Sequence, residues 1–316
     1  MYNSRKLVFI FKLFLFAIFA SFIYVILTCF ITEYTSDHFH KNVKYIKGSY
    51  GHTFTRLNEV KRTKNIDILF LGSSHAYRGF DTRIFNKEGY SSFNLGSSSQ
   101  TPLQTMILLN RYIENLNPKL IIYEVYPETF SIDGVESSLD IISNDINDKE
   151  SLILLFQTKN IKVLNTLIFG LYKDIFYNNS NYYENRKKGE DYYISGGFVQ
   201  SNFKQFKNVK YKDKQAWKLK KRQFNNFSKN IEIIKNKHIK LLLVQAPITV
   251  AKYQTYTNND EFDIKMESFG DYINFNNNSC LNDSLHFYDN NHLNQAGVEI
   301  FNKELIRKLN FLQIKL

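Results

Sequence analysis

Residues 66–75 read Ile-Asp-Ile-Leu-Phe-Leu-Gly-Ser-Ser-His, and this stretch decides the fold class. Its first six residues form a short run rich in β-forming apolar side chains, which predicts a buried strand. Gly72 frees the backbone for a sharp turn that lifts the next side chains out of the sheet edge. Serines therefore follow the strand directly, at the edge where open α/β sheets bind their ligands.

A second polar motif stands near the C-terminus, where residues 288–297 read Tyr-Asp-Asn-Asn-His-Leu-Asn-Gln-Ala-Gly. Asp289 and His292 are three positions apart, so both side chains of one short turn can face a single point. There the carboxylate orients the imidazole, and the imidazole takes the proton of a serine hydroxyl. The two motifs together indicate a serine esterase or acyltransferase.

Between the motifs, short apolar runs alternate with segments of helical spacing, as in α/β folds. The expected strands are 66–71, 91–95, 120–126, 239–245 and 272–276, and the expected helices are 82–89, 101–116, 214–237, 259–269 and 294–309. We therefore expect a three-layer α/β/α sandwich with a parallel sheet of about five strands. All candidate site residues then follow the carboxyl ends of strands.

The N-terminus predicts a membrane anchor. After Arg5 and Lys6 the chain is mainly apolar to Ile31, and residues 13–31 alone suffice to cross ~30 Å of hydrocarbon as a helix. Lys12 is close enough to the basic end to snorkel. Basic residues on the short N-terminal side predict a single-pass cell-membrane protein with an extracytoplasmic domain. The weaker alternative is lipid modification of Cys29.

These observations divide the chain into an anchor at 1–31, a polar stalk at 32–61 and one α/β domain at 62–316. The domain contains an insertion at about 137–213, which we expect to cover the site or to contact substrate. Cys29 and Cys280 are the two cysteines, and they are placed too differently to form a disulfide framework. No cofactor or metal-binding motif is found in the sequence.

A formal net charge of +11 raises the question of nucleic acid binding. The Lys and Arg residues are spread along the chain rather than gathered in a binding motif, and the domain is expected outside the membrane, so we exclude that class. A basic surface suits anionic lipid head groups or an anionic envelope polymer. The alternative is compositional bias, since the chain is rich in Lys, Asn and Ile throughout.

The order of Ser, Gly and Asp-x-x-His resembles the SGNH (GDSL-type) hydrolase superfamily, over roughly residues 62–310. In that family the nucleophile is the serine of Gly-Asp-Ser, which corresponds here to Ser74, with Ser73 at the position of the aspartate. The resemblance also implies that Asp289 and His292 complete the triad. It implies an oxyanion hole formed by the backbone N–H groups of Ser74 and Gly96, the latter within Phe-Asn-Leu-Gly-Ser at 93–97.

The third family block, normally Gly-x-Asn-Asp after a strand, is absent. Here the strand 120–126 continues into Pro127 and Glu128, so one oxyanion donor is unassigned. Tyr126 is a candidate for supplying an O–H at that place, and Glu124 also flanks it.

Several nearby residues have alternative interpretations. Ser73 is the competing nucleophile. His75 should point away from Ser74, which favours a structural role, with a substrate or supporting contact as the alternative. Arg78 and Asp81 are expected to form an ion pair that fixes the loop. His286 could mimic the Asp-x-x-His pair in reverse, but its neighbours suggest core.

The resemblance extends to membrane-tethered proteins that O-acetylate exopolysaccharides and to the D-alanyl-transfer protein of teichoic acids, which act beside a multi-spanning acyltransferase. It implies a transferase that moves an acyl group, expected to be acetyl, from an acyl-Ser74 to an envelope or exported glycan. The expected partners are membrane lipid, a glycan acceptor and such a multi-spanning acyltransferase. An esterase or deacetylase of similar esters, and a non-catalytic glycan-binding or scaffold protein, are the alternatives.

Overall fold

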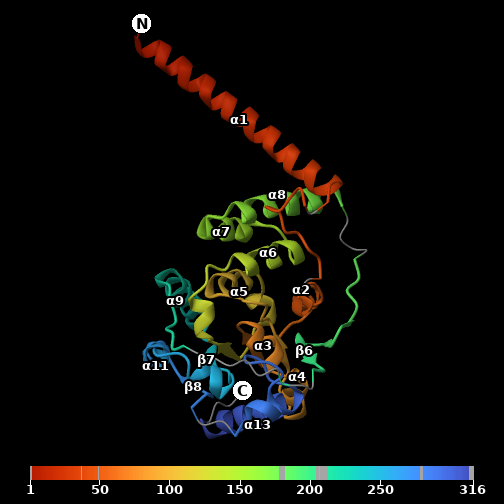
Figure 1. Cartoon of the computed structure of the whole chain (residues 1–316), viewed down its shortest axis with the longest axis vertical. Coiled ribbons are helices and arrows are strands. Elements are labelled where there is room, and N and C mark those ends of the chain that lie inside the picture. Colours follow the sequence, from red (N-terminus) through yellow and green to blue (C-terminus); the bar gives the residue numbers. More distant parts are fainter. Residues whose placement is uncertain are drawn as a thin grey trace.

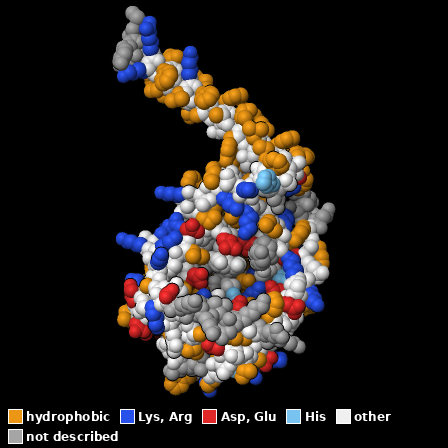
Figure 2. All heavy atoms as spheres, in the orientation of Figure 1, with side chains coloured by type: hydrophobic (Ala, Val, Ile, Leu, Met, Phe, Trp, Pro, Cys, Tyr) orange, Lys and Arg blue, Asp and Glu red, His pale blue; other side chains and the backbone are white. Residues whose placement is uncertain are grey.

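The computed structural model describes residues 2–36, 38–48, 50–177, 182–203, 206, 213–277 and 280–312. A long N-terminal helix, α1 (Tyr2–Tyr34), extends from an α/β domain (Figure 1). Within α1, the segment Arg5–Tyr34 is long and apolar enough to cross a membrane. Hydrophobic side chains cover this helix, and Lys and Arg gather at its N-terminal end (Figure 2).

The domain is built on a five-stranded sheet, which confirms the predicted fold class. Its strand order is β2-β1-β3-β7-β8, and every pairing is parallel. The bounds are β1 Ile68–Leu71, β2 Ser92–Asn94, β3 Leu120–Glu124, β7 Lys240–Gln245 and β8 Tyr272–Asn274. Each lies inside an expected strand, because β1, β3 and most of β7 are apolar runs buried on both faces, as parallel sheets require.

Alternate side chains of the strands point into two separate cores. Leu69 and Leu71 belong to a core covered by α5 (Pro102–Leu116), α9 (Lys221–Asn236) and α11 (Asn259–Glu267). Ile68 and Phe70 belong to the opposite core. That core is covered by α3 (Ser74–Gly79), α4 (Thr82–Lys87) and α13 (Gln295–Phe311). The result is the expected three-layer sandwich.

The middle of the chain adds a helical layer and a small sheet. The helices are α6 (Val135–Asn144), α7 (Lys149–Thr158) and α8 (Ile161–Phe176), stacked between α5 and α1 in Figure 1. The antiparallel sheet comprises β4 (Lys187–Lys188), β5 (Asp191–Ile194) and β6 (Phe198–Ser201). Within the predicted insertion, residues 178–181, 204–205 and 207–212 lie outside the described residues.

The segment expected as a stalk runs along the domain. It contains the 3₁₀ turn η1 (Tyr50–His52) and α2 (Thr53–Val60), which packs on α6. Arg56 is fully buried and donates hydrogen bonds to the carbonyl oxygens of Gly51 and Gly197. These contacts fix residues 50–60 on the domain.

Some expected boundaries differ from those observed. The helix expected over 214–237 begins only at Lys221, because residues 214–220 are extended and bury the side chain of Trp217, which stacks on Tyr256. The short elements η2 (Pro127–Phe130), α10 (Val250–Tyr253) and α12 (Asp283–His286) were not expected. Nor was α3, the short helix that begins at Ser74.

Candidate active site

The turn after β1 places two serines at the carboxyl edge of the sheet. Gly72 has φ +136°, and a Cβ there would lie 2.5 Å from Glu124 Oε2 and 2.9 Å from the Glu124 carbonyl oxygen. Only glycine fits this conformation and this close approach to β3. The chain then enters α3, with Ser73 as its N-cap and Ser74 as its first residue.

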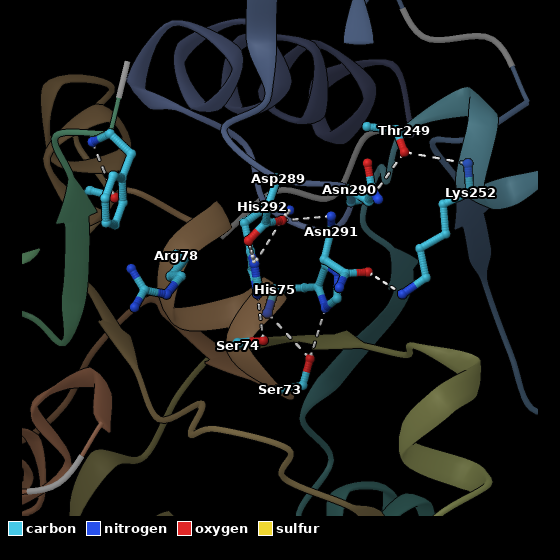
Figure 3. A network of polar contacts seen from close by, with 12 residues as sticks. Ser73, Ser74, His75, Arg78, Thr249, Lys252, Asp289, Asn290, Asn291 and His292 are labelled. Carbon is cyan, nitrogen blue, oxygen red and sulfur yellow. Dashed lines mark hydrogen bonds and ion pairs between the residues drawn. The ribbon is translucent and has the colours of Figure 1, made fainter. Parts of the chain in front are cut away.

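Ser74, His292 and Asp289 form a continuous relay (Figure 3). Ser74 Oγ lies 2.8 Å from His292 Nε2, and His292 Nδ1 lies 2.9 Å from Asp289 Oδ2. The serine comes from the start of α3, whereas the other two come from the loop between α12 and α13. The structure thus brings together three residues predicted from two distant motifs, in the geometry of a Ser-His-Asp triad.

The loop itself holds Asp289 as a carboxylate. Its Oδ1 accepts hydrogen bonds from the backbone N–H groups of Asn291 and His292, both at 2.7 Å. Burial alone would raise the pKa of Asp289, but the hydrogen bond and charge of His292 and these backbone donors outweigh it and lower the pKa to about 2. The aspartate is therefore ionised and able to orient the imidazole at neutral pH.

Ser73 has a different environment. It is buried, and its Oγ donates to Glu124 Oε2 at 2.8 Å while accepting from the backbone N–H of His75 at 3.2 Å. The Ser73 backbone N–H also donates to Glu124 Oε2, at 2.8 Å. Both contacts fix the turn from inside the fold, so this serine caps α3 and does not approach His292.

Glu124 flanks the position at which the Asn of the third block was expected from the resemblance. It ends β3, is almost fully buried, and binds Ser73 from the neighbouring strand end. Burial raises its pKa to about 7, although the two hydrogen bonds from Ser73 act in the opposite direction. Ser73, bonded to a glutamate whose pKa is about 7, thus stands where a Gly-Asp-Ser turn has its aspartate.

His75 is buried beside the relay rather than turned away from the site. Its ring stacks on His292, with centroids 5.2 Å apart, and lies 4.2 Å from the ring of Tyr126. Its Nδ1 is 3.2 Å from Ser73 Oγ. Burial, together with the charges of His292 and Lys252, lowers the pKa of His75 well below its usual value. A neutral imidazole therefore forms one wall behind His292.

Gly96, the predicted second oxyanion donor, packs against the serine turn. A Cβ at this position would lie 2.8 Å from the Ser73 carbonyl oxygen and 2.9 Å from Ala76 Cβ. Its N–H donates to Asn94 Oδ1 at 3.1 Å. Binding an oxyanion would require exchange of that hydrogen bond, so the role of Gly96 stays a prediction.

Tyr126 belongs to a polar cluster with Asn291, Lys252 and Glu128. Its hydroxyl donates to Asn291 Oδ1 at 3.2 Å, and Lys252 Nζ donates to the same oxygen at 2.5 Å. Lys252 Nζ also lies 3.7 Å from Glu128 Oε2. Sequence reasoning did not identify Lys252 or Asn291. Asn291 lies inside the Asp-x-x-His motif and could have been noticed, whereas Lys252 has no motif around it.

The expected ion pair between Arg78 and Asp81 is wrong. Arg78 instead makes two hydrogen bonds of 2.7 Å to Asp191 of β5. Asp81 caps α4 by accepting from the backbone N–H of Arg83 and pairs with the Arg83 side chain. The partner of Arg78 is supplied by the small sheet, which local sequence did not reveal. His286 is also not a core residue: it is partly exposed, and its Nδ1 accepts from the backbone N–H of Asn282.

The relay opens into a cavity of about 620 Å³. Besides the relay, its wall includes Arg78, Tyr126, Tyr288, Phe203 and the loop 132–136. A second cavity of about 510 Å³ adjoins it, since both are lined by Ser98, Glu136 and Phe203. Residues 191 and 203, from the expected insertion, therefore border this space.

Comparisons with known proteins gave few matches. No family model and no curated protein matches the chain. Among solved structures, one described as a "putative acylhydrolase" from Bacteroides fragilis is similar, with a TM-score of 0.42, 11 % identity, and coverage of 84 % of this chain and 98 % of that one. A GDSL-like lipase from Bacteroides thetaiotaomicron is similar with a TM-score of 0.43, 12 % identity, and coverage of 84 % and 100 %.

At these identities the residues of the site, and not the similarities, decide the chemistry. The sheet order places β1 between β2 and β3, the serine follows β1 directly, and the Asp-x-x-His loop reaches that serine from the C-terminal part of the chain. The fold and the arrangement of Ser74, His292 and Asp289 are therefore those that the resemblance to the SGNH (GDSL-type) hydrolase superfamily predicts.

Proposed function

We propose that this protein is an extracytoplasmic serine acyltransferase that moves an acyl group onto an envelope or exported glycan through an acyl-Ser74 intermediate. The observation that carries the proposal is the relay from Asp289 through His292 to Ser74, with contacts of 2.9 and 2.8 Å, open to a cavity of about 620 Å³. Ser74 is the serine within reach of the imidazole, whereas Ser73 is buried and bonded to Glu124.

In the first half-reaction, Ser74 Oγ attacks the carbonyl carbon of the donor ester while His292 Nε2 takes the hydroxyl proton. In this proposal the backbone N–H of Ser74 binds the oxyanion, and the N–H of Gly96 would contribute after releasing Asn94 Oδ1. Collapse of the tetrahedral intermediate breaks the ester bond, and His292 returns the proton to the leaving alcohol. Because one missing oxyanion donor costs about 10²–10³ in rate, a site with a single donor would be slow.

The second half-reaction transfers the acyl group. His292 takes a proton from an acceptor hydroxyl, whose oxygen attacks the ester carbonyl carbon of acyl-Ser74, and the proton returns to Ser74 Oγ as the bond breaks. Asp289 keeps the imidazole oriented and stabilises its charged form throughout. Water in place of the acceptor would give hydrolysis by the same steps, so the distinction lies in which molecule occupies the cavity.

The adjoining cavity supports transfer. A transferase needs room for a donor and an acceptor, and the second space of about 510 Å³ borders the first at Ser98 and Glu136. Its wall contains the side chains of Asp140 and Ser143, which suit the hydroxyl groups of a sugar, beside apolar Leu139. The membrane-compatible α1 adds a reason to act on a substrate made or exported at the bilayer.

The donor of such a reaction must be an activated ester or thioester presented at the bilayer. A multi-spanning acyltransferase that exports the acyl group is the partner we propose for this step. An esterase or deacetylase of similar ester substrates is the second candidate function, because the relay serves it equally well. A glycan-binding protein that retains the fold without catalysis is the third.

The deciding experiment uses the full chain in lipid nanodiscs with a small activated acetyl ester. We expect slow release of acetate, faster turnover when an envelope oligosaccharide is added, and an acetylated oligosaccharide by mass spectrometry. Ser74→Ala and His292→Ala should abolish both turnover and transfer, and Asp289→Ala should reduce them less than His292→Ala does. Ser73→Ala is the matched control, one residue away, and should retain transfer.

Rapid acetate release with no acylated sugar would establish the esterase instead. Absence of an acyl-enzyme with any ester, combined with binding of the oligosaccharide, would support the non-catalytic alternative. Full activity of the Ser74→Ala protein would refute the acyl-Ser74 intermediate itself.

A further inference from the structure

Helix α8 is apolar on two opposite faces. Its inner face, which includes Val163, Leu167 and Gly170, is buried against the domain. On the outer face, apolar residues recur at 161, 164, 168, 171 and 175, which is one stripe along a helix. The ends and middle of this stripe, Ile161, Leu171 and Ile175, are exposed. An apolar face that the domain leaves exposed indicates that the helix packs against a further partner.

The neighbouring elements extend this apolar surface. On α7, Leu152 and Phe156 are exposed one turn apart, and Phe156 is 70 % exposed. At the end of α8, Phe176 is 70 % and Ile175 is 72 % exposed. Scattered exposed hydrophobic residues are common, but large aromatic and aliphatic side chains gathered on two adjacent helices mark an interaction surface. We call these residues, with the α8 stripe, the α7–α8 face.

The anchor helix determines where this face lies. Tyr24 of α1 donates a hydrogen bond of 2.5 Å to Asn165 of α8, and Glu33 pairs with Lys173 at 2.7 Å. The two contacts are nine residues apart on α1 and eight apart on α8 (33 − 24 and 173 − 165), so the helices run side by side in the same direction. In Figure 1, α7 and α8 form the edge of the domain nearest to α1.

The position of Tyr24 along α1 sets the depth of α8. About twenty helical residues cross ~30 Å of hydrocarbon. A span that starts at Leu7 ends near Ile26, and one that starts at Leu13 ends near Ile31. In both registers Tyr24 lies in the half of the bilayer on the side of the domain. Asn165 contacts it there, so the first turns of α8 are at the level of the lipid.

We propose that the α7–α8 face is a membrane-binding surface that lies in the leaflet on the side of the domain, beside α1. The occupant is lipid: acyl chains contact Phe156, Ile161 and Ile175. The basic side chains of Lys149, Lys159 and Lys162, which are exposed or half-exposed at the helix ends, reach the head groups. The domain is then held by a crossing helix and an interfacial pair of helices, and this holds whether or not Ser74 is acylated.

The surface fixes the height and orientation of the domain. A single crossing helix with a flexible link would let the domain rotate, whereas three helices in contact with the bilayer restrict it. The site, at the edge of the sheet on the far side of α5 and α6, is then kept at a constant distance from the membrane (Figure 1). Such a geometry suits a substrate that extends from the bilayer.

Nitroxide spin labels test the depth directly. The full chain, with Cys29→Ala and Cys280→Ser, is labelled at Phe156→Cys or Ile175→Cys and placed in nanodiscs of phosphatidylcholine and phosphatidylglycerol. Oxygen concentrates in hydrocarbon, whereas a nickel chelate stays in water. We expect the ratio of oxygen to nickel accessibility to be several-fold higher at both positions than at Ile264→Cys. Ile264 is the matched control, since it is 67 % exposed on α11, away from α1.

Two positions on different helices keep the test valid if one variant folds poorly. Ratios at both positions equal to that of Ile264 would overturn the proposal, because the face would then be in water. Exclusion of both oxygen and nickel from Phe156 and Ile175 would also overturn it, since that result means burial against protein, either a second copy or a partner.

Discussion

Ser73 and Ser74 are adjacent in the chain but have different surroundings in the fold. Ser74 Oγ is 2.8 Å from the imidazole of His292 and lines the cavity, whereas Ser73 Oγ donates to buried Glu124. A fluorophosphonate should therefore label Ser74 in the wild type and fail to label Ser74→Ala, as measured by mass spectrometry of peptides.

Ser73→Ala should still be labelled, at a reduced level, because loss of the N-cap destabilises α3 by about 0.5–2 kcal/mol without removing the nucleophile. Its melting temperature should fall accordingly. Labelling of Ser73 in the Ser74→Ala protein would instead make Ser73 the nucleophile.

Buried Glu124 makes stability depend on pH. Its pKa is raised to about 7, so between about pH 4.5 and 7 the folded protein binds more protons at this residue than the unfolded chain does. Its contribution to the unfolding free energy must therefore fall as pH rises through this window, by about 3 kcal/mol at most. Glu124→Gln removes the titration and retains an oxygen that can accept from Ser73.

The measurement is the melting temperature of both proteins from pH 5 to pH 8. The difference, Glu124→Gln minus wild type, should grow with pH. Taking the difference is necessary because buried His52 and His75, whose pKa values are lowered, change stability in the opposite sense in both proteins. Asp289, with a pKa of about 2, acts only in more acidic solutions. A constant difference across the range would contradict the raised pKa.

At the scale of elements, the strands and the relay were predictable because their signals are local. A buried parallel strand such as β1 is a short apolar run, and Asp289 and His292 lie on one turn. The position of the site in the fold then followed from a general rule, since ligands of open α/β sheets bind at the carboxyl ends of the strands. Ser74 could therefore be placed in the site from the sequence, because it closely follows a predicted strand.

Contacts between distant elements could not be predicted. Arg78 pairs with Asp191 of β5, and Ser73 with Glu124 of β3, although nothing near either residue in the sequence indicates its partner. The start of α9 was misplaced for a related reason: burial of Trp217 against Tyr256 holds residues 214–220 extended where helical spacing predicted a helix. Tertiary packing overrides local propensity at such places.

At the scale of the whole molecule, the two cysteines report on topology. Cys280 is exposed on the domain, whereas Cys29 lies in α1. Arg5 and Lys6, at the start of α1, predict that the N-terminus lies in the cytoplasm and the domain outside it. A membrane-impermeant maleimide should therefore label the wild type in intact spheroplasts, at Cys280, and should not label Cys280→Ser.

Two further measurements, labelling after lysis and the intact mass of the labelled protein, make this experiment decisive. Lysed spheroplasts give the total amount of reactive Cys280, so labelling that appears only after lysis would place the domain in the cytoplasm and remove the basis for an extracytoplasmic glycan acceptor. The intact mass of the labelled protein tests the alternative at Cys29, because lipid modification there requires cleavage before that residue and would remove residues 1–28. A retained N-terminus with labelled Cys280 is the result that we expect, since Tyr24 and Glu33 of an uncleaved α1 are the residues that join the anchor to α8.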